Sequence, residues 1–125
     1  MKNKRNKIIK YIIFIIYISI NLIFMIKHEP WRDEARAWIM AKNLNLKDLY
    51  IVSKYDGHPI LWHLILMPFA KLGFPYITMQ IINLLICIIA AYIFYFKINK
   101  KNLYKTIILF GDPFIYVYTT LARNY

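Results

Sequence analysis

The chain has 125 residues, of which 60% are hydrophobic, and its 17 lysine and arginine residues against 6 acidic residues give a formal net charge of +11. A soluble domain of this length interrupts its apolar segments with charge, whereas here the charges flank long uncharged runs. A nucleic-acid-binding domain would instead present its basic residues on a folded surface. Composition and charge therefore exclude an ordinary soluble domain, argue against a nucleic-acid partner, and predict an all-α membrane protein.

The first long apolar run, residues 8–26, predicts a transmembrane helix. About 20 residues at 1.5 Å each cross the roughly 30 Å hydrocarbon layer, and Lys10 can extend its amine toward the headgroups. Residues 1–7 contain four basic residues, which the positive-inside rule places in the cytoplasm. The length of the run, and the absence of a small-residue cleavage site after it, exclude a cleaved signal peptide.

Two more spans are predicted downstream. Residues 76–96 carry no charge and are followed directly by the basic loop of residues 97–105, so the second span returns the chain to the cytoplasm. Residues 106–121 form the third predicted span, which leads to the outer segment of residues 122–125. The shorter apolar block of residues 60–74 is interrupted by polar residues, and we expect it to form a helix at the outer interface.

Asp112 lies inside the third predicted span, between Gly111 and Pro113. An intramembrane carboxylate is costly and usually faces a polar cavity or a partner. Alternatively, Asp112 lies close enough to the cytoplasmic interface to be hydrated. The sequence leaves both interpretations open.

The predicted outer loop, residues 27–75, contains five of the six acidic residues, all three histidines and all three tryptophans. Such a composition exceeds what a linker between spans requires, so function is expected here. The first half of the loop predicts a helix that starts at Pro30 or Asp33, with Arg36 toward its polar side. Its apolar residues recur at helical spacing and should lie on the membrane: Trp31, Ala35, Trp38 and Ile39.

The second half of the loop predicts a short helix from about Leu46 to a turn at Asp56 and Gly57. His58 follows this turn and is held extended by Pro59. Taken alone, the loop has a structural interpretation, in which Asp33 caps a helix, Glu34 favours the helix dipole and His58 occupies a turn. His63 is also expected to be structural.

Three segments in order, WRDEARAW, YDGHPILWHLIL and FIYVYTTLARNY, resemble the polytopic glycosyltransferases of the GT-C class. The resemblance is to the branch that includes protein O-mannosyltransferases and lipid A aminoarabinose and galacturonic acid transferases, and it covers residues 31–125. Members of this class take a sugar from a polyprenyl-phosphate carrier in the membrane and transfer it to an acceptor outside the cytoplasm. The resemblance thus implies an enzyme of the cytoplasmic membrane with its N-terminus inside and its active loop outside.

The resemblance also implies roles for individual residues. Asp33 and Glu34 correspond to the catalytic acidic pair, with Asp33 as the base of an inverting displacement and Glu34 as its alternative or support. His58 would lie near the donor phosphate, and Arg36, Arg123 and Tyr125 are further candidates for binding the donor phosphate or the substrate. Some members of the class use a divalent metal. The sequence shows no ligand cluster, so the cofactor is left open.

Two positions depart from the family pattern. Leu121 stands where relatives often carry an acidic residue, and Asp112 stands where many have serine. Full members are several times longer, so we expect this chain to be the N-terminal part of such an enzyme and to be inactive alone. The alternative is a small non-enzymatic membrane protein with three spans, such as an assembly subunit or the product of a decayed gene.

Overall fold

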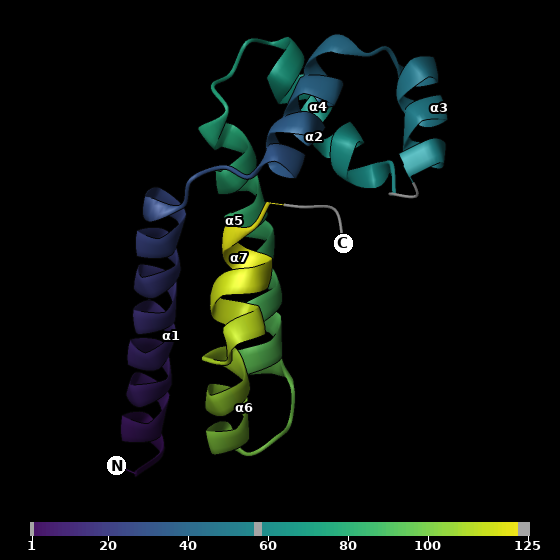
Figure 1. Ribbon diagram of the computed structural model, residues 1–125. Coiled ribbons are helices and arrows are strands. Elements are labelled where there is room, and N and C mark those ends of the chain that lie inside the picture. The colour runs from purple at the N-terminus through teal and green to yellow at the C-terminus, as the bar shows by residue number, and fades with distance from the viewer. Residues whose placement is uncertain (1, 57–58, 123–125) are drawn as a thin grey trace. The chain divides into compact units, whose positions relative to one another are not determined.

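A computed structural model describes residues 2–56 and 59–122, and every regular element in these ranges is a helix (Figure 1). The chain divides into two compact units. Unit 1 comprises Met1–His28 and Asn83–Thr120, and unit 2 comprises Glu29–Ile82 and Leu121–Tyr125. The all-helical class predicted from the sequence is confirmed over the described residues.

Two helices in the described part of the chain are long and apolar enough to cross a membrane. The first is Arg5–Lys27, within helix α1 (Lys2–Lys27). The second is Ile77–Lys97, which consists of α5 (Ile77–Tyr92) and the π-helix η1 (Ile93–Lys97). Both have a mean hydropathy of 2.3, and they coincide with the first two predicted spans to within a few residues.

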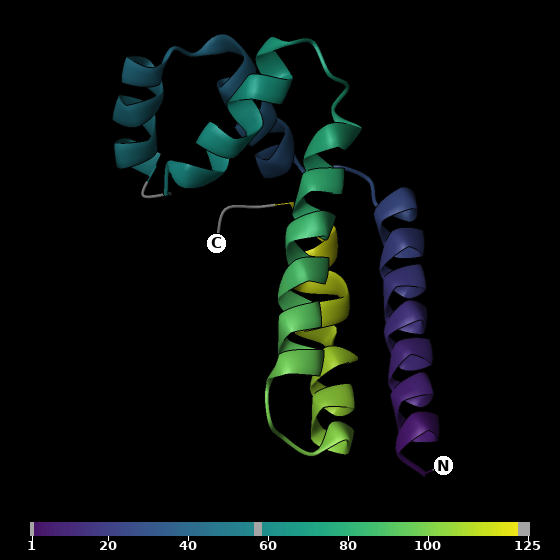
Figure 2. The same ribbon diagram turned by 180° about the vertical axis from the view of Figure 1, so that it is seen from behind.

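Aromatic side chains dominate the core of unit 1. Near one end, the ring centroids of Tyr11 on α1 and Phe96 in η1 lie 5.0 Å apart, so α1 and α5 run antiparallel. The start of α1 and the basic loop of residues 97–101 therefore lie at the same end of unit 1, as both views show (Figures 1 and 2). The buried core consists of Phe14, Tyr17, Ala91, Tyr95 and Leu109.

The third predicted span is interrupted. The predicted span of residues 106–121 is not one regular helix, because an α-helix ends at Leu109 and the next helical element begins at Pro113. Pro113 explains the break, because it has no N–H to donate and its ring clashes with the preceding turn. The side chain of Asp112 is exposed within unit 1. The segment comprises α6 (Asn102–Leu109), the π-helix η2 (Pro113–Val117) and α7 (Tyr118–Thr120).

Side chains from the two longer helices bond to backbone carbonyls in this irregular segment. The Tyr17 hydroxyl of α1 donates to the carbonyl oxygen of Phe114 at 3.0 Å. The Asn83 amide of α5 donates to the carbonyl oxygens of Tyr118 and Thr119 at 3.0 and 3.2 Å. Tyr118 and Thr119 lie in the last turn before the helix ends at Thr120, where carbonyls have no helical N–H donor, so the Asn83 amide supplies one.

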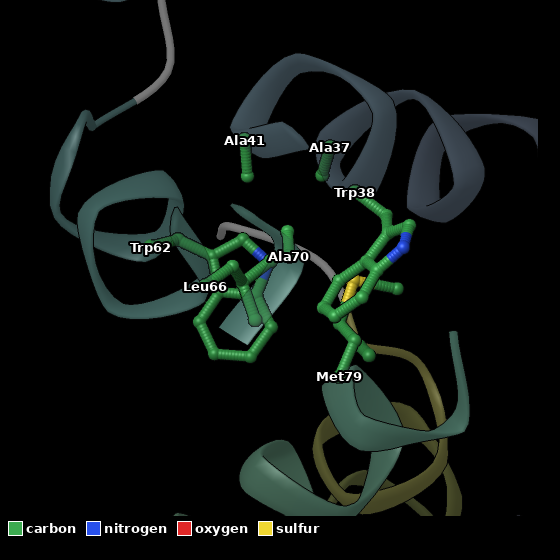
Figure 3. Close-up of a cluster of buried hydrophobic side chains, with 8 residues drawn as sticks. Ala37, Trp38, Ala41, Trp62, Leu66, Ala70 and Met79 are labelled. Atoms are coloured by element: carbon green, nitrogen blue, oxygen red, sulfur yellow. The ribbon is translucent and has the colours of Figure 1, made fainter. Parts of the chain in front are cut away.

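Unit 2 is built around α2 (Arg32–Asn43) and α4 (Leu61–Lys71), with α3 (Leu46–Asp56) between them in the sequence. Ala37 and Ala41 point from α2 toward the side chains of α4, and Met79 approaches from the first turn of α5 (Figure 3). The small alanine side chains allow the bulkier residues of α4 to pack closely against α2. The buried cluster is Ala37, Trp38, Ala41, Trp62, Leu66, Ala70, Met79 and Ala122.

The packed face of α2 differs from the face predicted by apolar spacing. Glu34, Ala37, Trp38 and Ala41 are buried, whereas Trp31 and Ile39 are 48% and 55% exposed. Apolar spacing predicted that Trp31, Trp38 and Ile39 share a face turned toward the membrane, but Trp38 is buried on the packed face together with the small Ala37 and Ala41. The result is a second, exposed apolar stripe on the same helix.

The predicted interfacial helix over residues 60–74 is shorter in the structure, because Gly73 ends α4. Gly73 has φ 84°, and its N–H donates to the Ala70 carbonyl at 3.3 Å. The N–H of Phe74 donates to the Phe69 carbonyl at 3.1 Å, and the two rings pack edge to face. This pairing is a Schellman motif, which terminates α4 and turns the chain toward α5.

Candidate functional site

The start of α2 positions the acidic pair. The N-cap is Trp31, with extended backbone angles (φ −77°, ψ 157°), and its carbonyl accepts the first helical bond from the Ala35 N–H at 3.1 Å. Asp33 is thus the second residue of the helix and not its cap, and the predicted starts at Pro30 or Asp33 are both wrong. Glu34 fixes the observed start, because its Oε2 accepts the Trp31 N–H at 2.8 Å.

Glu34 is fully buried, with 0% exposure, and both of its carboxylate oxygens accept backbone N–H groups. While Oε2 bonds to Trp31, Oε1 accepts the N–H of Ala122 at 2.7 Å. Burying a carboxylate is costly unless hydrogen bonds replace its hydration, and such charge-assisted bonds are short and strong. The side chain therefore joins the start of α2 to a residue 88 positions later in the sequence.

The ring of Tyr76, in the turn before the second apolar helix, forms part of the surroundings of Glu34. Burial, and then the negative charge of Glu34, raise the pKa of the Tyr76 hydroxyl above its usual value of 10.0. This buried hydroxyl has no hydrogen-bond partner among the described residues. The ring also packs edge to face on Trp38, with centroids 6.2 Å apart. Glu34 thus lies in an aromatic setting that bulk water does not reach.

Asp33 has the opposite environment, because its side chain is exposed. It opens onto a hollow of about 520 Å³ along one face of α2. Arg36 follows Asp33 by three positions and borders the same hollow, so a carboxylate and a guanidinium lie on one helix face. The described residues that line the hollow are Arg32, Asp33, Ala35, Arg36, Ile39 and Met40.

The other predicted site residues have different outcomes. His58, Arg123 and Tyr125 lie outside the described residues. His63 is buried in α4 with 3% exposure, which agrees with a structural role. Within residues 2–56 and 59–122, no group of three or more histidine, cysteine or acidic side chains could hold a metal ion. The structure thus places two predicted residues, Asp33 and Arg36, on a shared open face.

The contact between Glu34 and Ala122 was missed by the sequence analysis. The bond from Glu34 to the Trp31 N–H could have been predicted, because a glutamate at the third position of a helix commonly accepts the N-cap N–H. The bond from Glu34 to Ala122 has no sequence signature, because the donor is a backbone group of a distant alanine. The position of Tyr76 beside Glu34 was also not predicted, because Tyr76 is the first residue of an uncharged apolar run.

Comparison of the chain with protein-family models, with curated proteins and with solved structures found no match. The resemblance to GT-C glycosyltransferases therefore stays a prediction from the three ordered motifs.

Proposed function

We propose that this chain is the N-terminal part of an integral-membrane glycosyltransferase, which transfers a sugar from a polyprenyl-phosphate donor to an acceptor outside the cytoplasm. The observation that carries the proposal is the separation of the acidic pair. Asp33 is exposed beside Arg36 on an open face of α2, whereas Glu34 is buried and bonded to the backbone. One carboxylate is therefore accessible to a substrate, and its neighbour holds the structure around it.

In the proposed reaction, Asp33 takes the proton from an acceptor hydroxyl as the hydroxyl oxygen attacks the anomeric carbon. The bond from that carbon to the phosphate oxygen breaks, and the lipid phosphate leaves with the bonding electrons. A positioned base contributes about 10²–10⁴-fold to the rate. An anion near the reacting carbon also stabilises its oxocarbenium character. Attack from the face opposite the phosphate gives inversion.

The leaving phosphate needs positive charge, which Arg36 supplies in this proposal. Arg36 borders the same hollow as Asp33, so both groups can reach one bound donor. His58, Arg123 and Tyr125 are additional candidates for donor or substrate contacts from the resemblance alone. The net positive charge of the chain also favours an anionic lipid carrier as partner.

Three spans, with the N-terminus in the cytoplasm, are part of the proposal. The start of α1 and the basic loop of residues 97–101 lie at one end of unit 1, as a common cytoplasmic side requires. Residues 106–121 form the third span in this proposal, despite the irregular backbone of the segment. Irregular backbone is tolerated at membrane depth where neighbouring side chains satisfy its polar groups, and Tyr17 and Asn83 do so here.

The helices of unit 2 are proposed to lie on the outer surface of the bilayer. They expose large apolar side chains together with basic residues, which is the composition of interfacial helices. A surface position would bring Asp33 to the level at which a polyprenyl phosphate presents its sugar. The exposed apolar residues of α2, α3 and α4 include Ile39, Leu46, Tyr50, Ile51, Tyr55, Leu61 and Leu64.

A transfer assay tests the proposed activity. Membranes that contain the full-length protein are incubated with polyprenyl phosphate carrying radiolabelled mannose, galacturonic acid or aminoarabinose in turn. We expect one donor to yield label in a new lipid, polymer or protein fraction. If none of the three donors is consumed above the level of membranes without the protein, the proposal for this donor class is wrong, and the non-enzymatic alternative is favoured.

A further inference from the structure

We propose that Glu34 is a positioning residue whose buried carboxylate clamps the start of α2 to the Leu121–Ala122 segment and so sets the position of Asp33. As a statement about sugar transfer, this inference rests on the proposed function. As a statement about the fold, it stands on the two hydrogen bonds alone. In this proposal Asp33 reacts with the substrate, and Glu34 holds the first turn of α2 in place.

The geometry argues against Glu34 as a base. A general base must come within about 2.6–3.2 Å of the hydroxyl proton that it removes, or act through one water. Glu34 has no exposed surface, and each of its oxygens already accepts a backbone N–H. A substrate hydroxyl could reach it only if the clamp opened. Asp33, one residue earlier, needs no such opening because its side chain is exposed.

The second hydrogen bond distinguishes a clamp from an ordinary helix cap. Capping the N–H of Trp31 needs one oxygen, yet the other oxygen bonds to Ala122. Ala122 is itself fully buried and belongs to the same cluster as Ala37 and Trp38. If the carboxylate were lost, a buried N–H would remain without its partner, which favours release of the segment.

The clamp affects Asp33 through the first turn of α2. Trp31, Asp33 and Glu34 lie within one helical turn, so the bond that fixes Trp31 also fixes the direction in which the Asp33 side chain leaves the helix. A misplacement of about 1 Å at a reacting group can cost about 10²-fold in rate. A buried residue that touches no substrate can therefore control the rate.

Glu34→Gln is the direct test, because glutamine keeps the shape but places an amide donor against one of the two N–H groups. The first readout is labelling of Ala122→Cys by a membrane-impermeant maleimide in a Cys87→Ser background, since Cys87 is the only cysteine. We expect Glu34→Gln to raise the labelling rate of Ala122→Cys about tenfold or more by local opening. Asp33→Asn, the matched control, should leave the labelling rate unchanged. Equal labelling in the presence and absence of Glu34→Gln would overturn the clamp.

The second readout separates positioning from acid–base chemistry. We expect Glu34→Gln to lower kcat by about 10–10²-fold while the residual activity keeps the acidic limb of its pH profile, because Asp33 remains the base. Loss of that limb in Glu34→Gln would make Glu34 the base and overturn the inference. Labelling needs no sugar donor, so the clamp can be tested even if the proposed transferase activity fails.

A variant on the other side of the bond keeps the test valid if Glu34→Gln does not fold. Ala122→Pro removes the donor N–H and leaves the carboxylate intact. We expect Ala122→Pro alone to lower kcat by about 10–10²-fold, because it removes the same bond. Where Glu34→Gln also folds, the double variant should lose less than the product of the two single losses. Independent, multiplicative losses would show that the two groups do not act through one bond.

Discussion

Asp33 and Glu34 are adjacent in the sequence, yet the side chain of Asp33 is exposed and that of Glu34 is completely buried. The two carboxylates therefore have different chemical capacities. An exposed carboxylate can meet a substrate, whereas a buried one with both oxygens bonded to the backbone contributes to the fold.

The hydrogen bond between Tyr17 and the Phe114 carbonyl should stabilise the interrupted third segment. We expect Tyr17→Phe to lower the free energy of unfolding in detergent by about 0.5–1.5 kcal/mol, because it removes the donor and leaves the half-buried Phe114 carbonyl without it. Ser19→Ala is the matched control, since the exposed Ser19 hydroxyl donates to the Ile15 carbonyl of its own helix at 3.0 Å. An equal effect of both variants would show that Tyr17 does not hold the segment.

Lys105 should hold the end of the second apolar helix. Its Nζ donates to the carbonyl oxygens of Tyr95 at 2.7 Å and Ile98 at 3.2 Å, and the residue is 3% exposed. We expect Lys105→Met to destabilise the protein by about 1–3 kcal/mol, measured by thermal or detergent unfolding, because the charged donor is lost. Lys101→Met removes the same charge from an exposed position and should have little effect. The opposite order of effects would contradict this capping role.

The three-span proposal predicts the side of the membrane on which each loop lies. Alkaline phosphatase is active only outside the cytoplasm, so a fusion after residue 101 should be inactive and a fusion after residue 122 should be active. The green fluorescent protein fused at the same two positions should give the reverse pattern. Inactive phosphatase at residue 122 would show that residues 106–121 do not cross the membrane.

Tyr76 should make stability sensitive to alkaline pH. Because its pKa is raised in the folded protein, the folded state favours the neutral phenol, whereas the unfolded phenol ionises near the ordinary value of 10.0. The stabilisation from this group is therefore complete below pH 10 and is lost as the pH rises above it. We expect the loss of unfolding free energy above pH 10 to be smaller in Tyr76→Phe. Tyr55→Phe, at an exposed position, should match the parent protein; equal pH slopes in all three would contradict the assignment.

The sequence predicted the parts of the fold that depend on local pattern. The uncharged runs predicted both long apolar helices, Arg5–Lys27 and Ile77–Lys97. They could do so because the length and composition of a segment decide whether its helix is able to cross a bilayer. The short helices of the loop were also predicted, but the packed face of α2 was not. Apolar spacing assigned Trp38 to the membrane-facing surface and cannot show that it packs inside unit 2 with Ala37 and Ala41.

The candidate site was predictable in its residue types but not in its division of roles. The acidic pair and Arg36 followed from the motif, yet nothing in the two letters Asp-Glu indicates which carboxylate is buried. That outcome depends on the N–H of Ala122, a backbone group that every residue except proline carries and that has no sequence signature. Long-range bonds to the backbone are thus the part of such a site that requires a structure.

The most direct test of the proposed function compares Asp33→Asn with Glu29→Gln in the full-length protein. Both substitutions replace an exposed carboxylate of unit 2 with its amide, but only Asp33 borders the hollow with Arg36. Sugar transfer from the active polyprenyl-phosphate donor is measured in membranes with equal amounts of each variant. We expect Asp33→Asn to lose about 10²-fold or more in kcat, and Glu29→Gln to retain the parent rate. Near-normal transfer by Asp33→Asn would remove Asp33 from the mechanism and contradict the central claim.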